Sequence, residues 1–459
     1  FLDYYLPFTV NLVNKYINIE KKKEKTFVEN KLILKMGVYV KEIESECSRL
    51  VNLISKAKDK ELDFEMKVLI LKEVIRMNND TEKTKLNFKE GTLSKIIGAV
   101  ILIAIIVVAI VIKNGKSFTT INVYGAVGGG KEDLLADEEI NKIFARKYGF
   151  KFVQDSWSNG KTIVSPLLRE DNSHYDLAFF SDQRYYDYFK TSPTGNEAPR
   201  DRVIDGDLVL NTPIVIYSWD TVVDALIKEN IVTVRDNVYY ITDMNKLINY
   251  ILEGKKWSDI GLDSIYGSIN IGSTDPVTSS PGATYYGLLL SIMAGGDVNQ
   301  VSITDALPKL REFYLKSGYM NNTPADLFSM FLKTGMGAKP MIVDYEKSVI
   351  DFANANPEGW SQVKDKIRIL YPTPTIWNSH CIAAFNDNGK KLLDAFDDKE
   401  VAQRSWERYG FRVGTTGGKY DVSKISGTIK GIPQEITSVT SGLRMDVYNQ
   451  VIDYLKTNQ

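Results

Sequence analysis

The spacing of hydrophobic residues divides the chain into regions of different structure. In residues 1–90 the apolar positions recur three and four residues apart, as in the stripe formed by Val40, Ile43 and Cys47, which is the spacing of amphipathic helices. From residue 119 onward, short runs rich in Val and Ile alternate with segments of helical spacing. The first region therefore predicts a helical hairpin or small bundle. The second predicts an α/β protein with mainly parallel sheets.

Between these regions lies an uncharged apolar run from Ile96 to Ile112. As a helix it would be about 26 Å long, the short end of a membrane crossing. A buried core helix normally keeps a polar stripe and this run has none, so we expect a transmembrane helix. Because a long segment precedes the run and no small-residue cleavage site follows it, it does not resemble a signal peptide. Lysines gather before the run, which predicts a cytoplasmic N-terminus and an extracytoplasmic domain at 119–459.

Composition and charge narrow the class of protein. Of the 459 residues 44% are hydrophobic and 25% are charged, which is typical of globular domains. The formal net charge of -1 gives no reason to expect nucleic acid as a partner. The two cysteines, Cys47 and Cys381, would lie on opposite sides of the membrane and could not pair, so the outer domain must be stable without a disulfide.

The sequence shows no catalytic or metal-binding motif. It lacks HExxH, the GxSxG elbow and any Cys/His cluster with metal-ligand spacing. The segment "GGGKED" is not a phosphate-binding Walker loop, because Glu132 stands where Ser or Thr is required. We therefore expect no enzymatic activity, no metal and no cofactor.

A stretch dense in hydroxyl side chains, from Ile269 to Leu290, offers the first candidate binding site. A strand is expected to end near Ile271 and a helix to begin near Pro281. The exposed amides and the dipole at the start of a helix favour an oxyanion, carboxylate or phosphate, and the hydroxyls add neutral donors. The alternative is an ordinary N-cap, which would need one hydroxyl only. The candidate ligand-binding residues here are Thr274, Asp275, Thr278, Ser279 and Ser280.

Further candidates follow the carboxyl ends of predicted strands, where open α/β sheets bind their ligands. Gly128 and Gly129 belong to a glycine cluster that could form a backbone nest for an anion, or else a flexible turn. Ser181 and Asp182 end the strand "DLAFF", and they would either contact a solute or cap a turn.

The outer region resembles type II periplasmic solute-binding proteins from about Thr119 to Lys456. The matching pieces, in family order, include "GAVGGGKEDLL", "YDLAFFSD", "NTPIVIYSW", "IGSTDPVTSSPGATYYGLL", "GAKPMIVDYE" and "LYPTPTIWNSH". The resemblance implies two α/β lobes that close on a solute, with lobe I at about 119–212 and 375–459 and lobe II at about 213–374. The crossings between the lobes would be "NTPIVIYSW" and "IRILYPTPTIW".

This resemblance adds candidates for the cleft between the lobes. Tyr345 ends a strand at a position that often faces the cleft in the family, and Trp377 follows the second crossing together with His380. Arg184 could neutralise an anion. The alternatives are a packed aromatic residue for Tyr345, a structural or surface role for His380, and an acidic partner for Arg184.

The opening segment "FLDYYLPFTVNLVNKYINIE" resembles the start of the XpaC family over roughly 80 residues. Relatives of that family are linked to toxic-anion resistance. The segment contains no His, no clustered Asp and no glycine-rich phosphate loop, so we do not expect hydrolase activity from it.

The sequence thus predicts a membrane-anchored extracytoplasmic protein that captures a small anionic solute by lobe closure, for transport or sensing. Its expected partners are the solute, the bilayer through one helix, and either an ABC permease or stress-response membrane proteins. The alternative is a scaffold subunit of a toxic-anion resistance complex, whose outer domain would bind a protein.

Overall fold

The computed structural model describes residues 120–157, 174–191, 199–296, 298, 300–414 and 421–457. The chain divides between Phe118 and Thr119, and all described residues belong to the unit Thr119–Gln459. The predicted inner helices, the apolar run Ile96–Ile112 and the XpaC-like segment lie outside the described residues. Among the residues that are described, no helix has the length and hydrophobicity needed to cross a membrane.

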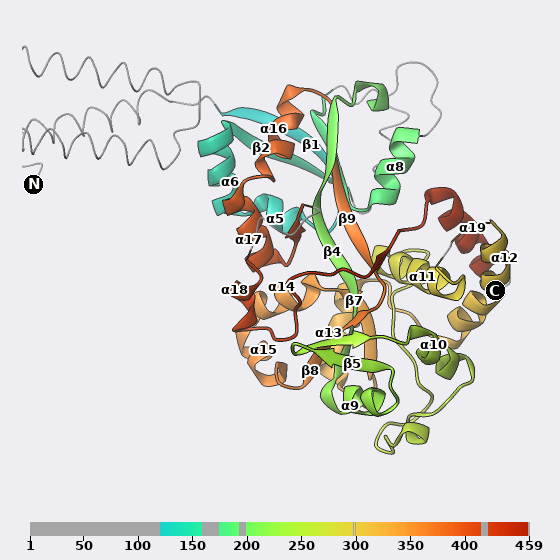
Figure 1. Ribbon diagram of the computed structural model, residues 1–459. Helices are drawn as coiled ribbons and strands as arrows, with labels where there is room; N and C mark the ends of the chain where they lie inside the picture. The colour runs from blue at the N-terminus through green and yellow to red at the C-terminus, as the bar shows by residue number, and fades with distance from the viewer. Residues whose placement is uncertain are drawn as a thin grey trace, which may run out of the picture. The chain divides into compact units, whose positions relative to one another are not determined.

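One long strand, β4 (Asp205–Trp219), belongs to both halves of the domain. Its first part pairs with β9 and its second part with β7 and β8 (Figure 1). The first sheet has the order β2–β1–β3–β9–β4, with β1 (Ile121–Gly128), β2 (Phe150–Trp157), β3 (Leu177–Phe180) and β9 (Thr375–Ala384). The second continues from β4 through β8 (Ile367–Pro372), β6 (Val238–Ile241) and β5 (Val232–Arg235), with β7 (Met341–Tyr345) on the other side of β4.

Helices cover both sheets. Those beside the first sheet are α5 (Glu132–Ala136), α6 (Glu138–Ile143), α8 (Gln183–Thr191), α16 (Asp387–Ala395) and α17 (Lys399–Tyr409). Those of the second half are α9 (Asp220–Lys228), α10 (Met244–Leu252), α11 (Ser280–Met293), α12 (Gln300–Lys316), α13 (Pro324–Thr334), α14 (Lys347–Ala355) and α15 (Pro357–Val363). The chain closes with β10 (Arg412–Val413), α18 (Ser423–Ser426), β11 (Val439–Thr440) and α19 (Met445–Lys456).

The α/β architecture is confirmed, but the expectation of mainly parallel sheets is wrong for the central strands. The ladders β1–β2, β1–β3 and β6–β8 are parallel, whereas β4 runs antiparallel to β7, β8, β9 and β10. The reason is that β4 carries the chain out of the first sheet, and β8 and β9 carry it back in the opposite direction.

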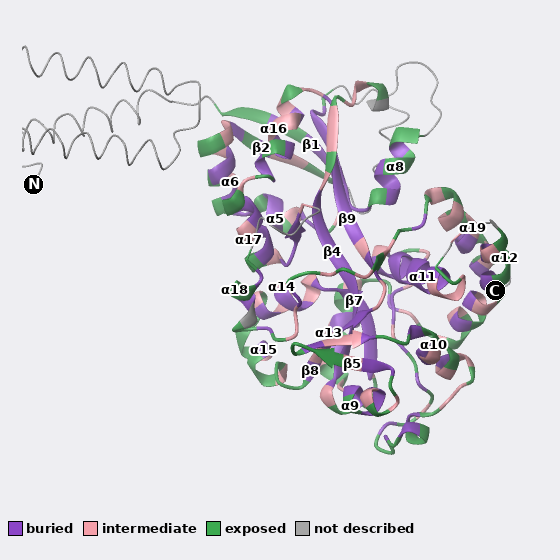
Figure 2. Cartoon of the chain, in the orientation of Figure 1, coloured by how far each residue is buried: buried purple, intermediate pink, exposed green. Residues whose placement is uncertain are grey.

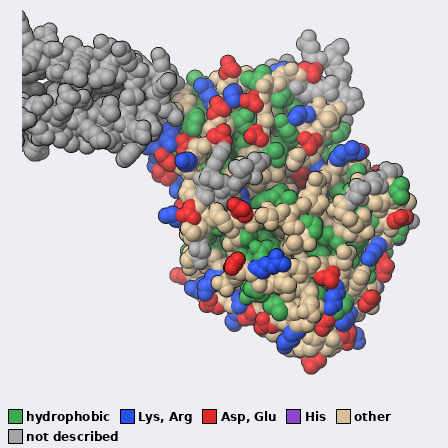
Figure 3. All heavy atoms as spheres, in the orientation of Figure 1, with side chains coloured by type: hydrophobic (Ala, Val, Ile, Leu, Met, Phe, Trp, Pro, Cys, Tyr) green, Lys and Arg blue, Asp and Glu red, His purple; other side chains and the backbone are tan. Residues whose placement is uncertain are grey.

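Burial explains why most side chains of β4 are apolar. All residues from Val209 to Trp219 are buried, because helices cover both faces of the sheets (Figure 2). Exposed residues concentrate on the outward faces of the helices and on loops. Acidic and basic side chains are interspersed over the face that Figure 3 shows, in keeping with the net charge near zero.

A buried ion pair connects the two halves beside β4. Glu346, next to the start of α14, is 0% exposed, and Arg412 on β10 is 2% exposed. Arg412 Nε donates to one carboxylate oxygen at 2.7 Å and its Nη2 donates to the other at 2.9 Å. The Tyr371 hydroxyl donates to the same carboxylate at 2.7 Å. This two-pronged, fully satisfied arrangement is the strong form of a charged hydrogen bond.

The C-terminal segment contacts both halves of the domain. The Ser291 and Thr440 hydroxyls are 3.0 Å apart, and Leu443 packs against Gly287 of α11. Helix α19 lies against α12 of the second half and α8 of the first (Figure 1). The division into lobe I (119–212 and 375–459) and lobe II (213–374) stays a prediction, and α19 is the part of the chain that it describes least well.

Removing one partner of the buried pair should be costly. We expect Arg412→Met to lower the free energy of unfolding by about 3–5 kcal/mol, because it leaves the Glu346 carboxylate buried without its cation. Urea unfolding measures the change. The double variant Glu346→Gln/Arg412→Met should recover part of the loss, since no charge is then stranded.

Lys430→Ala provides the matched control. The Lys430 amine is 4.0 Å from the Asp365 carboxylate, and both side chains are largely exposed. Its removal should change stability by less than about 0.5 kcal/mol. An Arg412→Met loss of that same small size would show that the pair does not hold the halves together.

Candidate functional site

Strands β1 and β3 end side by side at one edge of the first sheet, as expected for parallel neighbours. At this edge the backbones approach closely, because a Cβ added to Gly128 would lie 3.2 Å from Ser181 N and 3.3 Å from Ser181 Oγ. The two predicted site residues Gly128 and Ser181 therefore meet. Gly129 follows and is half-buried.

Lys131 lies at the same edge and was not predicted from the sequence. It is 2% exposed, its Nζ donates to the Gly128 carbonyl, and the amine sits 4.6 Å from the centroid of the Phe179 ring. Burial lowers the pKa of Lys131 to about 7. The signal in the sequence was a lysine directly after the glycine cluster at a strand end.

Strand β9 adds Asn378 and His380 beside Ser181. The Asn378 amide nitrogen donates to the Ser181 carbonyl at 3.2 Å and to His380 Nε2 at 3.1 Å. Because Nε2 accepts this bond, the proton of the neutral imidazole is on Nδ1. Burial, reinforced by Lys131 and Lys347, lowers the pKa of His380 well below its ordinary value, so the ring is neutral at pH 7.

Several buried polar atoms around this edge have no hydrogen-bond partner among the described residues. They are Ser181 Oγ, Asn378 Oδ1 and His380 Nδ1. In the second half, Ser279 Oγ at the start of α11 also has no partner among the described residues. Each of these residues is at most 8% exposed. Buried polar atoms in folded proteins nearly always have a partner, so such a group marks a place where a ligand can supply the missing bonds.

Helix α11 begins where the hydroxyl-rich stretch predicted a helix. Its flanking residue Ser279 makes no side-chain capping bond, so an ordinary N-cap does not account for the Ser279 hydroxyl. The Asp275 carbonyl instead accepts from the backbone N–H of Ser279 at 2.9 Å. Gly282 is needed here, because a Cβ at this position would lie 2.3 Å from the Thr274 carbonyl oxygen.

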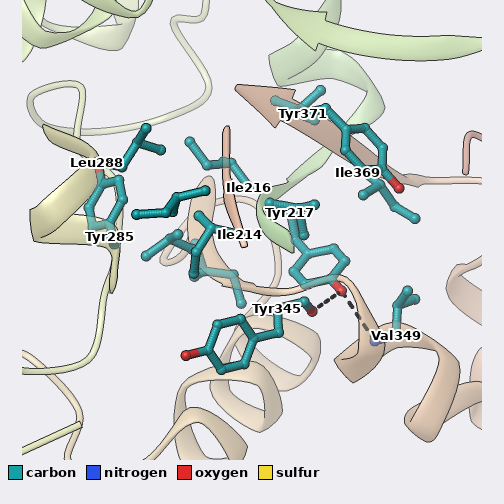
Figure 4. Close-up of a cluster of buried hydrophobic side chains, with 14 of the residues drawn as sticks. Ile214, Ile216, Tyr217, Tyr285, Leu288, Tyr345, Val349, Ile369 and Tyr371 are labelled. Atoms are coloured by element: carbon teal, nitrogen blue, oxygen red, sulfur yellow. Dashed lines mark hydrogen bonds between the residues drawn. The ribbon is translucent and has the colours of Figure 1, made fainter. Parts of the chain in front are cut away.

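Tyr345 ends β7 next to α11. Its hydroxyl is 3.4 Å from Thr284 Oγ1, and burial, with the nearby Asp182 carboxylate, raises the pKa of Tyr345 above its ordinary value. The Tyr217 hydroxyl donates to the Tyr345 carbonyl at 2.7 Å and accepts from Val349 N at 3.2 Å (Figure 4). These two bonds fix the junction between β7 and α14 that positions Tyr345.

Asp182 and Arg184 form a buried pair near Tyr345. Arg184 donates from Nε at 3.1 Å and from Nη2 at 2.7 Å to the two oxygens of the Asp182 carboxylate. The expectation that Arg184 neutralises an anionic solute loses its support, because the Asp182 carboxylate already neutralises the charge of Arg184. The alternative, an arginine paired with an acid, is the one observed.

Tyr448 of α19 touches both halves at this point. Its hydroxyl donates to the Pro276 carbonyl at 2.9 Å, and the Arg184 guanidinium lies 4.4 Å from the centroid of its ring. The contact spans 172 residues of sequence, and nothing in the local sequence pattern indicated it.

The remaining predicted residues are not drawn into this group. Thr278 is exposed, and Thr274 is buried in the second half, where its backbone forms a β-bridge with Asn321. The Thr274 hydroxyl has no partner among the described residues. Asp275 and Ser280 are half-buried. Trp377 alternates with Asn378 along β9 and therefore faces the opposite side of the strand from Asn378 and His380.

This fold is that of the type II periplasmic solute-binding proteins. An extracellular solute-binding protein from Bordetella parapertussis superposes with a TM-score of 0.51 at 11% identity, over 73% of this chain and 98% of that one. An ABC transporter structure from Clostridium perfringens gives 0.48 at 16% identity, over 73% and 98%. A ferric binding protein from Campylobacter jejuni gives 0.46 at 15% identity, over 73% and 97%.

At these identities the likeness is one of fold. No protein-family model matches the chain, and no curated protein matches its sequence. The resemblance of the first residues to the XpaC family therefore receives no support.

The lowered pKa of Lys131 predicts a pH-dependent stability. Between pH 7 and pH 10 the unfolded chain holds a proton on this amine that the folded domain has lost, so stability should rise with pH. In Lys131→Met this rise, at most about 1.4 kcal/mol per pH unit, should be missing. Urea unfolding at pH 6, 8 and 10 compares the two proteins, with Lys430→Met as the exposed-lysine control. Parallel curves for all three would contradict the assignment.

Proposed function

We propose that residues 119–459 bind a small anionic solute between their two lobes. The proposal rests on the buried cations. Among the described residues these are Lys131, Arg184 and Arg412. Arg184 is paired with Asp182 and Arg412 with Glu346, whereas Lys131 has no carboxylate within ion-pair distance. A buried positive charge without a counter-ion favours an anionic ligand.

The neutral groups around Lys131 suit the same ligand. His380 Nδ1–H and the Ser181 hydroxyl can donate to an anion without adding charge. An anion held near Lys131 would raise the pKa of the amine again, because an opposite charge favours the protonated form. The site would therefore be close to neutral when empty and would take up a proton as the anion binds.

We expect lobe closure because the candidate ligand-binding groups belong to both halves of the domain. Lys131, Ser181 and His380 belong to the first half, while Ser279 and Tyr345 belong to the second. A solute that touches both sets binds more tightly when the halves are close together, and this difference in affinity is what drives closure.

The proposal includes the position of the domain in the cell. The apolar run Ile96–Ile112 would anchor it in the membrane as a single span, with the N-terminus cytoplasmic and the solute-binding domain extracytoplasmic. The solute would then pass to an ABC permease, or its binding would be sensed by stress-response membrane proteins. The likeness to an extracellular solute-binding protein supports the outer placement of the domain.

Native mass spectrometry of the full chain tests the function. We expect release of a co-purified small anion, or a thermal shift with phosphate, sulfate, molybdate, tellurite or short organic acids. If no molecule is released and no probe shifts the melting temperature, solute binding is refuted, and a scaffold whose outer domain binds a protein becomes the better account.

Substitutions at the site should weaken binding of whichever probe gives a shift. We expect Lys131→Met and His380→Phe each to raise Kd by about tenfold or more, because each removes a donor that an anion would need. In the wild type, affinity should fall as pH rises above 7, since Lys131 loses its proton, and it should be flatter with pH in Lys131→Met. Isothermal titration calorimetry measures both, with Lys430→Ala as the control that should match the wild type.

Tyr448 should affect how long the closed form persists. Tyr448→Ala removes both its hydrogen bond to Pro276 and its ring beneath Arg184, so we expect the solute to dissociate about tenfold faster with little change in association rate. Tyr448→Phe keeps the ring and should show a smaller effect. Stopped-flow kinetics separates the two rates, and a slower association alone would argue against a role in closure.

A further inference from the structure

The hydrogen-bonding groups at the edge of the first sheet, where β1 and β3 end, require more of a solute than a negative charge. His380 Nδ1 is a donor, and the Lys131 ammonium is a donor when protonated. Asn378 Oδ1 is an acceptor only, and it has no partner among the described residues although Asn378 is 3% exposed. A bare anion can satisfy the first two groups but not the third.

The orientation of the Asn378 amide follows from its neighbours. Its nitrogen lies 3.2 Å from the Ser181 carbonyl, which can only accept a hydrogen bond. Exchanging the amide oxygen and nitrogen would place two acceptors against each other, so the oxygen is the atom left over. The Ser181 hydroxyl does not satisfy it either, because that hydroxyl is itself without a partner.

We infer that the solute is an oxyanion or carboxylate that also carries a hydroxyl donor, which Asn378 Oδ1 accepts while His380 and Lys131 hold the anionic oxygens. This inference rests on the proposed function, since it concerns the same site. Inorganic phosphate near pH 7 retains a hydroxyl and fits the description, as does a small hydroxy acid. Sulfate, molybdate and simple carboxylates lack the donor.

The energetic reason is the cost of leaving a buried acceptor unpaired. A site built to accept a hydrogen bond rejects an analogue that lacks the donor, because the acceptor stays desolvated without compensation. The size and charge of phosphate and sulfate are similar, so this single hydrogen bond would decide between them. Serine hydroxyls such as Ser181 and Ser279 can donate or accept, and they do not discriminate.

Two matched pairs of probes test the inference on the full chain. Calorimetry at pH 7 compares inorganic phosphate with sulfate, and glycolate with acetate, so that each pair differs in a hydroxyl donor. We expect the member with the hydroxyl to bind at least about tenfold more tightly in any pair that binds. If a solute is released from the purified protein, we expect it to carry a hydroxyl donor as well.

Asn378→Ala tests the residue itself. It should reduce the ratio of affinities within a pair to below about threefold, mainly by weakening the hydroxyl-bearing member. Lys430→Ala should leave the ratio unchanged. If Asn378→Ala does not fold, as circular dichroism would show, the wild-type ratios still decide the question.

The outcomes separate this inference from the function on which it rests. If sulfate binds as tightly as phosphate, or a released solute carries no hydroxyl donor, the inference is overturned and solute binding stands. An undiminished ratio in a folded Asn378→Ala protein overturns the role of Asn378. If no probe binds and no small molecule is released, both the inference and the proposed function fail.

Discussion

Strand β4 is shared by two sheets and couples the two halves of the domain. Its first half hydrogen-bonds to β9 and its second half to β7 and β8, so the sheets cannot separate without breaking a continuous ladder. Beside it, the Glu346–Arg412 pair joins α14 to β10 in a buried contact with both charges fully satisfied. If the halves close on a solute as proposed, they would move by a bend of β4 and of the β8–β9 connection.

Much of this architecture could be predicted from the sequence, because burial on both faces leaves a local record. The run "LVLNTPIVIYSW" is largely apolar for that reason, and the resemblance placed its part "NTPIVIYSW" at a crossing between lobes, which stays a prediction. Strand direction leaves no such record, since parallel and antiparallel strands share the same period of side chains. The packing of the C-terminal segment could not be predicted either, because it rests on single contacts such as that between Ser291 and Thr440, 149 residues apart.

In the candidate site, too, features set by local sequence could be predicted and features set by tertiary contacts could not. Ser181, Ser279 and Tyr345 were predicted because each stands at the end of a strand or the start of a helix, which is a local property. Lys131 was overlooked, although it follows a predicted glycine cluster, because only the fold shows that it is buried without a carboxylate. For Arg184 the sequence left an anion or an acid as partner, and the contact with Asp182 decided between them. A missing partner is a property of tertiary structure, and no sequence motif records it.

The charge distribution explains how one lysine could supply the charge of the proposed site. The two buried arginines form ion pairs inside the protein, with Asp182 and Glu346, so their charges stabilise the fold and are not available to a solute. A further permanent charge at the lobe edge would have to be buried at full cost, whereas a lysine can lose its proton when no anion is present. Because the pKa of Lys131 is about 7, the amine can be neutral when no anion is bound and charged when one is, at a small cost in free energy near pH 7. The neutral donors and the single unpaired acceptor around it can then select the solute by its hydrogen bonds, since charge alone attracts every small anion alike.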